Sequence, residues 1–152
     1  MKKTILSEKI AICSRSLSAN KILRSEINLK YDNVKFNDEG KSLKGQLLID
    51  FLKDCTHAIT ALEVIDESIL SQLPKLRVIS KYGVGLDMID IDALKDHNVR
   101  LGWTGGVNRR SVSELVLSST ISLLRHVPAA NNEVKNGLWR QHIGTELSNL
   151  TF

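Results

Sequence analysis

The order of short apolar segments along residues 9–101 constrains the fold more than any other feature of this sequence. Each apolar segment is followed by a stretch whose apolar residues recur at helical spacing, as Ile22, Leu23 and Ile27 do. Strands are expected at residues 9–13, 34–36, 58–60, 76–79 and 99–101, and helices at about 18–27, 41–53, 66–73 and 91–96. The links are too long for hairpins. The pattern therefore predicts an α/β fold, a flavodoxin-like parallel sheet of order 2-1-3-4-5 with helices on both faces.

Polar residues suggest where these helices begin and end. Ser18 is expected to cap the first helix after a polar turn at residues 14–18, and Asp66 to cap a later helix that stops at Pro74. These signals predict boundaries as well as the order of the elements.

Composition excludes several functional classes. The chain has 152 residues, 42% of them hydrophobic, which suits one globular domain with an appendage. Its 21 Lys and Arg residues give a net charge of +4 but form no block, and only 5% of residues are aromatic. This favours a solvated surface over a nucleic-acid partner. No apolar run approaches the roughly 18 residues of a membrane span.

The cysteines and histidines show no metal-binding pattern. Cys13 and Cys55 lack a paired spacing and are interpreted as reduced, buried thiols of a cytoplasmic protein. The four histidines show no helical ligand pair and are assigned to surface or capping positions: His57, His97, His126 and His142. No metal site is expected.

The segment KYGVGLDMID, residues 81–90, follows the fourth expected strand. Gly83 and Gly85 let the backbone approach a ligand closely, and ligands of open α/β sheets bind beyond the carboxyl ends of the strands. The amides of Val84 and Gly85 could hold an anion, as backbone nests do. A plain tight turn is the alternative interpretation of the same glycines.

The character of the chain changes after Trp103. Gly105 and Gly106 form a joint, and a strongly apolar helix is expected over residues 111–126, with Glu114 completing a capping box begun by Ser111. Its apolar residues cover more than one face, which predicts burial on more than one side. A second helix over residues 128–136 is expected to end at Gly137, a typical C-cap.

From about residue 59 to 151 the sequence resembles the D-isomer-specific 2-hydroxy-acid dehydrogenases, the family of phosphoglycerate dehydrogenase and glyoxylate/hydroxypyruvate reductase. The glycine loop KYGVGLDMID, Asp87, the strand after it, SVSEL at residues 111–115 and GTEL at 144–147 carry the resemblance. It implies a substrate domain at residues 1–103, and at 104–152 a hinge and crossover helices that begin an NAD-binding domain. The crossover helix, Ser111 to His126, would also build a homo-oligomer, a dimer in this family.

The resemblance also implies roles for individual residues. The amides of Val84 and Gly85 would bind the carboxylate of a small 2-hydroxy or 2-oxo acid, and Val84 would also face the nicotinamide. Lys81 and Asn108 match positions that can face substrate. A solvent-exposed lysine and a hinge or capping asparagine are the alternatives for these two side chains.

Two positions depart from the family pattern. Phosphoglycerate dehydrogenases usually carry an Arg-Ser pair after the third strand, where arginine suits a phosphate, and this chain has Thr60 and Ala61 there. As a substrate, a small 2-oxo or 2-hydroxy acid without a phosphate fits these residues no worse than phosphoglycerate does. The family's hinge also usually has a proline after threonine, where this chain has Gly105.

The cofactor fingerprint G-x-G-x-x-G and the family's catalytic arginine, glutamate and histidine lie beyond the matched segment. We therefore assign no catalytic residue, and expect a truncated chain that binds neither NAD nor NADP alone and has no dehydrogenase activity by itself. A binding or assembly module of the same fold is the alternative. A receiver domain or a flavodoxin is less compatible, because Ser14, Arg15 and Ser16 replace the acidic residues or phosphate loop that those proteins need.

Overall fold

The computed structural model describes residues 8–149. The chain divides into two compact units, Met1–Gly105 and Gly106–Phe152. The functional assignment predicted above for residues 1–103 and 104–152, a substrate domain and the start of an NAD-binding domain, stays a prediction.

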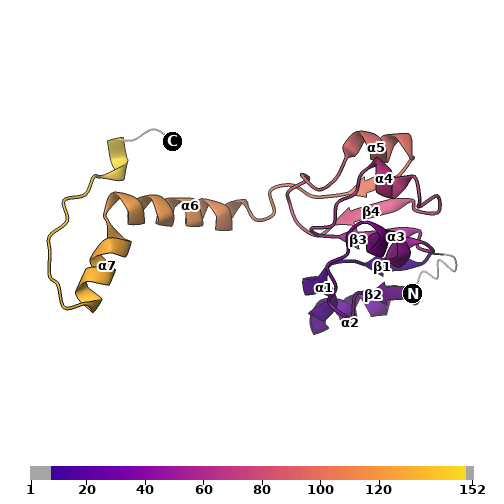
Figure 1. Cartoon of the computed structure of the whole chain (residues 1–152), viewed down its shortest axis with the longest axis horizontal. Helices are drawn as coiled ribbons and strands as arrows, with labels where there is room; N and C mark the ends of the chain where they lie inside the picture. Colours follow the sequence, from indigo (N-terminus) through magenta and orange to yellow (C-terminus); the bar gives the residue numbers. More distant parts are fainter. Residues whose placement is uncertain (1–7, 150–152) are drawn as a thin grey trace. The chain divides into compact units, whose positions relative to one another are not determined.

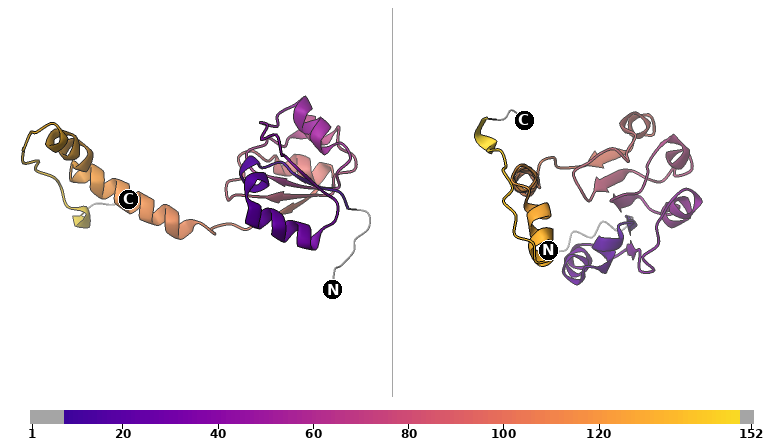
Figure 2. Two further views of the ribbon diagram at one scale, coloured as in Figure 1. Left: turned by 90° about the horizontal axis from the view of Figure 1, so that it is seen from below. Right: turned by 60° about the vertical axis from the view of Figure 1, so that its left-hand side comes forward.

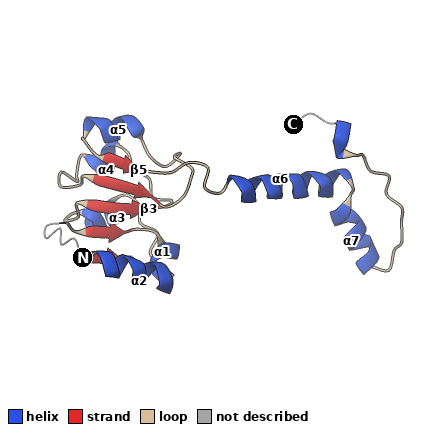
Figure 3. Cartoon of the chain, turned by 180° about the vertical axis from the view of Figure 1, so that it is seen from behind, coloured by secondary structure: helices blue, strands red, loops and turns tan. Residues whose placement is uncertain are grey.

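The first unit is built on a five-stranded parallel sheet in the order β2-β1-β3-β4-β5 (Figure 1). The strands are β1 Ile10–Ile12, β2 Val34–Phe36, β3 His57–Thr60, β4 Val78–Lys81 and β5 Arg100–Gly102. Their arrowheads all point the same way in Figure 3. The predicted flavodoxin-like order is confirmed.

Helices lie on both sides of this sheet (Figure 2). They are α1 Arg15–Ala19, α2 Lys21–Lys30, α3 Gln46–Leu52, α4 Glu67–Leu70 and α5 Ile91–Asp96. Alternate residues of β1 pack against the helices on the two sides of the sheet, because successive side chains of a strand point to opposite faces. Ile10 and Ile12 pack with Leu17 of α1, whereas Ala11 joins the larger core with α3, α4 and α5.

One face of the sheet is less covered over β4 and β5. Ile79 is fully buried in the larger core, whereas its neighbours Val78 and Ser80, which point to the other face, are only half-buried. Val78 pairs with His57 on one side and with Arg100 on the other, so these three side chains share that face. The predicted cover on both faces therefore holds best over β1 and β2.

The first two helices begin at other residues than predicted. Ser14 caps α1, accepting a hydrogen bond from the Leu17 amide at 3.3 Å, so residues 15–19 are helical and form no polar turn. Ser18 is buried, and its hydroxyl donates to the Ile12 carbonyl at 3.2 Å. Asn20 caps α2 instead, with its side-chain oxygen accepting from the amides of residues 22 and 23. The segment offers several capping side chains, and tertiary contacts decide among them.

Other boundaries differ by a few residues. Asp66 caps α4 as predicted, accepting from the Ile69 amide at 3.2 Å. The helix expected from residue 41 begins only at Gln46, because Gly45 before it has a left-handed φ of 49°. β4 spans Val78–Lys81, so it begins and ends two residues later than predicted and includes Lys81.

The second unit contains α6 Arg109–Leu124, α7 Val127–Lys135 and the 3-10 helix η1 Leu147–Asn149. The predicted capping box is wrong, because α6 begins two residues before Ser111 and Asn108 takes the N-cap position. Glu114 pairs with Arg110 one turn earlier, at 3.2 Å.

The end of α7 agrees with the prediction. Gly137 has φ 75°, and its amide donates to the Val134 carbonyl at 3.0 Å while the Leu138 amide donates to Glu133 at 2.9 Å. This pair of bonds is the Schellman motif, in which glycine accepts the left-handed backbone that ends the helix.

Candidate substrate-binding loop

The glycine loop follows β4 at the carboxyl edge of the sheet. Gly83 has a φ of 140°, a backbone conformation that residues with a side chain rarely adopt. A Cβ atom placed on Gly85 would lie 3.0 Å from a carboxylate oxygen of Asp87, tighter than ordinary packing allows. Glycine is therefore required at residue 83 by the backbone, whereas a Cβ at residue 85 would need a small shift of the exposed Asp87 carboxylate.

The amides of Val84 and Gly85 are available as donors. Among residues 8–149, no acceptor receives a hydrogen bond from either N–H group. Val84 is half-buried and Gly85 is exposed, so a small ligand can reach them. Two adjacent free amides in a glycine-containing turn form a concavity that suits an anion.

Trp103, the residue after β5, fixes the orientation of this peptide. Its indole Nε1 donates to the Val84 carbonyl at 2.9 Å. The peptide bond between Val84 and Gly85 is trans, so its carbonyl and its N–H point in opposite directions. The bond to Trp103 therefore turns the Gly85 N–H away from the indole. The sequence analysis did not identify Trp103 as a site residue.

Lys81 lies beside the loop. A Cβ atom on Gly83 would be 3.7 Å from Cε of Lys81, and the Lys81 ammonium donates to the carbonyl of Ala61. The side chain is half-buried and held at the carboxyl ends of β3 and β4, which differs from a freely solvated lysine. A Cβ on Gly83 would thus face Cε of Lys81, and a Cβ on Gly85 would face the Asp87 carboxylate.

The carboxyl end of β3 is held by a buried acidic residue. Glu63 is 8% exposed and accepts a hydrogen bond from the Ala61 amide at 2.6 Å. The Tyr82 amide donates to the Thr60 carbonyl at 2.7 Å, which ties the glycine loop to β3. The Thr60 hydroxyl is fully buried and has no hydrogen-bond partner among the described residues. No sequence signal separates Glu63 from a surface glutamate.

The carboxyl end of β1 is closed by a buried amide. Asn37, 5% exposed, donates to the carbonyls of Cys13 and Lys41 at 2.9 and 2.8 Å. Burial raises the pKa of the Cys13 thiol well above its usual value, and the charge of Glu63 raises it further. Cys13 and Cys55 are both free and buried, as predicted, and burial also raises the pKa of Cys55.

Asn108 belongs to the second unit, where its side chain makes no capping hydrogen bond with any described residue. Its predicted role toward substrate stays a prediction. Within the described part of the chain, no three His, Cys, Asp or Glu side chains gather as metal ligands do. No helix between residues 8 and 149 is long and apolar enough to cross a bilayer.

Comparison with known proteins decides the family. The family model described as "D-isomer specific 2-hydroxyacid dehydrogenase, catalytic domain" matches residues 10–146. The chain belongs to this family. The glycine loop and the ends of β1, β3 and β4 all lie within the matched segment.

Individual members of the D-2-hydroxyacid dehydrogenase family match parts of the chain. Glyoxylate/hydroxypyruvate reductase B of Serratia proteamaculans is 40% identical over 82 residues, covering 54% of this chain and 25% of that protein. D-3-phosphoglycerate dehydrogenase of Bacillus subtilis is 32% identical over 102 residues, 62% of this chain and 19% of its own length. The chain thus spans a quarter or less of these two relatives.

A solved structure extends the agreement to three dimensions. The cofactor-bound 3-phosphoglycerate dehydrogenase of Entamoeba histolytica superposes with a TM-score of 0.66 at 25% identity, over 93% of this chain and 43% of that one. The D-2-hydroxyacid dehydrogenase fold therefore accounts for most of the chain.

The glycine loop lacks the pattern of a dinucleotide-binding loop. The sequence contains Gly-x-Gly at Gly83 and Gly85, but residue 88, where the third glycine of G-x-G-x-x-G would stand, is Met88. That loop also leads into a turn closed by the Ile89 amide and the Leu86 carbonyl, with no helix N-terminus for a pyrophosphate. No chemical step can be assigned to NAD on these residues.

Proposed function

We propose that this chain is the substrate-domain portion of an NAD-dependent oxidoreductase that acts on the CH–OH group of a D-2-hydroxy acid. The observation that carries the proposal is the pair of free amides at Val84 and Gly85. They lie on a loop that requires glycine and is oriented by Trp103, in a chain of the D-2-hydroxyacid dehydrogenase family.

The substrate carboxylate accepts hydrogen bonds from these two amides. Lys81 releases the Ala61 carbonyl and brings a positive charge to the ligand, offsetting the nearby carboxylate of Asp87. Asn108, from the hinge, adds a polar contact. Val84 presents its side chain to the nicotinamide of NAD or NADP, which another part of the whole protein binds.

The substrate is a small acid without a phosphate. Thr60 is fully buried and Ala61 has no side-chain donor, so the end of β3 offers no arginine-like fork for a phosphate.

Hydride transfer requires positioning of the cofactor and a group that moves the hydroxyl proton, which the described site does not contain. The chain alone is therefore inactive, and its free, buried thiols suit the cytoplasm.

Affinity measurements test the binding role. Calorimetric titration of the 152-residue chain with D-glycerate gives saturable binding, and Lys81→Met weakens it by about tenfold, the cost of one charge-assisted hydrogen bond. At the glycine loop itself, followed through the NMR shifts of the Val84 and Gly85 amides, 3-phosphoglycerate binds no more tightly than D-glycerate. Equal D-glycerate affinities of the wild type and Lys81→Met, or preference of the loop amides for the phosphorylated acid, contradict the proposal. A clear rate with NADH and glyoxylate contradicts inactivity.

Self-association through α6 is part of the proposal. No residue of α6 is buried within the described chain, and six of its large apolar residues are 45% to 71% exposed, including Leu115, Leu117, Ile121 and Leu123. Apolar surface of this extent favours a partner, here a second copy. Sedimentation shows a dimer that Leu115→Glu dissociates, whereas Ile22→Glu, at a similarly exposed site of α2, leaves it intact. A wild-type monomer at all concentrations contradicts this.

A further inference from the structure

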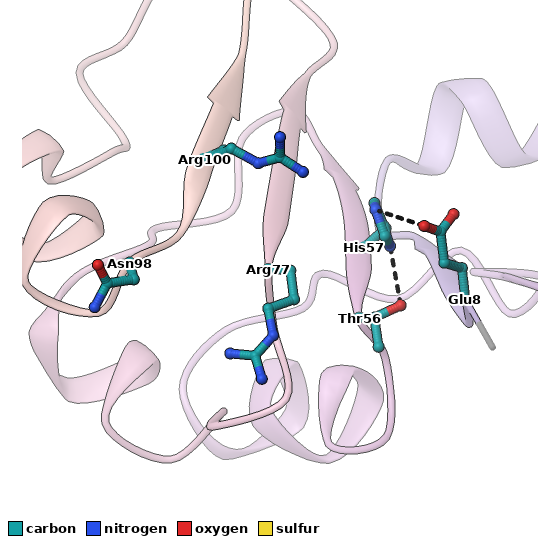
Figure 4. Close-up of a pocket in the computed structure, with 6 residues that line it drawn as sticks. All are labelled: Glu8, Thr56, His57, Arg77, Asn98 and Arg100. Atoms are coloured by element: carbon teal, nitrogen blue, oxygen red, sulfur yellow. Dashed lines mark hydrogen bonds and ion pairs between the residues drawn. The ribbon is translucent and has the colours of Figure 1, made fainter. Parts of the chain in front are cut away.

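A polar cavity lies at the amino ends of β3, β4 and β5, the edge of the sheet opposite the glycine loop (Figure 4). Its volume is about 390 Å³, within the range of small-molecule sites. The six side chains that line it come from the first unit: Glu8, Thr56, His57, Arg77, Asn98 and Arg100.

The sheet register places cationic and polar groups around this cavity. His57, Val78 and Arg100 pair across three strands, so the side chains of His57 and Arg100 lie on one face. In Figure 4 the guanidinium of Arg100 extends across β4, while Arg77 leaves the same edge in another direction. The two guanidinium groups therefore border different sides of one space.

These donors are not used within the protein. Neither the guanidinium of Arg77 or Arg100 nor the side chain of Asn98 has a hydrogen-bond or ion-pair partner among residues 8–149. The backbone amides at this edge are satisfied, since the Arg77 amide donates to Thr56 at 2.8 Å and the Arg100 amide to Arg77 at 2.9 Å. Donors for a ligand in this cavity must therefore come from side chains.

His57 is arranged to add another donor. The Thr56 hydroxyl accepts the Lys9 N–H at 3.2 Å and has two acceptors for its own proton, Nδ1 of His57 at 2.9 Å and the Lys9 carbonyl at 3.4 Å. When the proton goes to the nearer of the two, Nδ1, the ring proton of His57 is on Nε2, which lies 3.8 Å from the Glu8 carboxylate. Glu8 is the single carboxylate in the lining, so the two arginines leave the cavity with a net positive charge.

We propose that this cavity binds a small dianion of the phosphate-monoester class. Guanidinium groups bind phosphate oxygens through paired N–H donors, and the two here carry more charge than the single carboxylate of Glu8, so the cavity favours an anion. The remaining oxygens accept from Asn98 and from Nε2 of His57. A monocarboxylate has too few acceptor atoms and too little charge for this set of donors. The proposal is independent of the function proposed for the glycine loop.

Amide-resolved NMR of the full chain tests it, with inorganic phosphate as the probe at constant ionic strength. Saturable shifts are expected at the Arg77, Asn98 and Arg100 amides. Arg77→Gln and Arg100→Gln each weaken binding by about tenfold, as expected for one charge-assisted hydrogen bond. Arg15→Gln, which removes an exposed arginine of α1, is the control that leaves the affinity unchanged.

Three results would overturn the proposal: phosphate shifts that do not saturate, a loss with Arg15→Gln equal to that with Arg100→Gln, or succinate binding as tightly as phosphate. Both pocket arginines are exposed, so their variants are expected to keep the wild-type circular dichroism spectrum. A variant that loses that spectrum is replaced by Arg77→Lys or Arg100→Lys, which keep the charge but lose the fork and must still weaken binding.

Discussion

The indole N–H of Trp103 donates a hydrogen bond to the carbonyl oxygen of Val84 at 2.9 Å. The residue that follows β5 thus positions the loop that follows β4. Because the peptide after Val84 is trans, this one bond sets the direction of the Gly85 amide. The free donors of the candidate site depend on a contact between two neighbouring strands.

Trp103→Phe keeps an aromatic ring but removes the donor. We expect lower NMR order parameters at the Val84 and Gly85 amides, because the loop loses the bond that holds it, and weaker D-glycerate binding. The free energy of unfolding should fall by no more than about 1 kcal/mol, because one partly exposed hydrogen bond is lost. Trp139→Phe is the matched control, since Trp139 is 90% exposed in the second unit. Unchanged order parameters in Trp103→Phe would show that the indole does not hold the loop.

Gly105→Ala is expected to act through the same indole. A Cβ at residue 105 would lie 2.8 Å from Cη2 of Trp103, so the ring must move and its bond to Val84 weakens. Phenylalanine lacks that atom. Gly105→Ala should therefore weaken D-glycerate binding in the wild type and have little further effect in Trp103→Phe, a coupling that a double-mutant cycle measures. Additive effects would contradict the steric route.

Asn37→Ala should destabilise the first unit by about 2 kcal/mol, because it leaves the buried Cys13 carbonyl without the Asn37 donor. Asn33→Ala is the control, because Asn33 is exposed and precedes β2, the strand that Asn37 follows. Urea unfolding followed by circular dichroism gives both values. Equal midpoints for the two variants would mean that the buried amide contributes nothing.

Alkaline pH should destabilise the protein through its thiols. The pKa values of Cys13 and Cys55 are raised by burial, so the folded chain keeps their protons where the unfolded chain has lost them. Stability is unaffected by this linkage below roughly pH 8.5, where unfolded thiols begin to ionise, and falls as the pH rises further. A Cys13→Ala, Cys55→Ala double variant should show a shallower decline in its unfolding midpoint. An equally steep decline would assign the effect to other groups.

The sequence was sufficient to predict the sheet and its glycine loop. Short apolar strands and the need for backbone freedom at Gly83 leave local signals. Helix starts were harder, because Ser14, Ser18 and Asn20 are all capable caps, and only packing makes Ser18 a buried donor to β1. The capping box predicted for Ser111 and Glu114 failed in a similar way, because α6 starts at Arg109 and Ser111 therefore lies inside the helix.

The residues that support the site were not predictable in this way. Glu63, Asn37 and Trp103 act through partners in other elements, and a polar residue destined for burial has no local mark. The basic cavity depends on strand register, which places His57 and Arg100 on one face although they lie 43 positions apart in the sequence. Such pairs become visible only when the strand order and pairing are fixed.

The most direct test of the binding role is an amide-resolved NMR titration of the 152-residue chain with D-glycerate. We predict that the largest saturable shifts occur at the Val84 and Gly85 amides, and that Lys81→Met reduces the affinity while the same two amides still respond. Saturable shifts confined to residues outside the loop, or none at millimolar ligand, would contradict the assignment of this loop as the substrate carboxylate site.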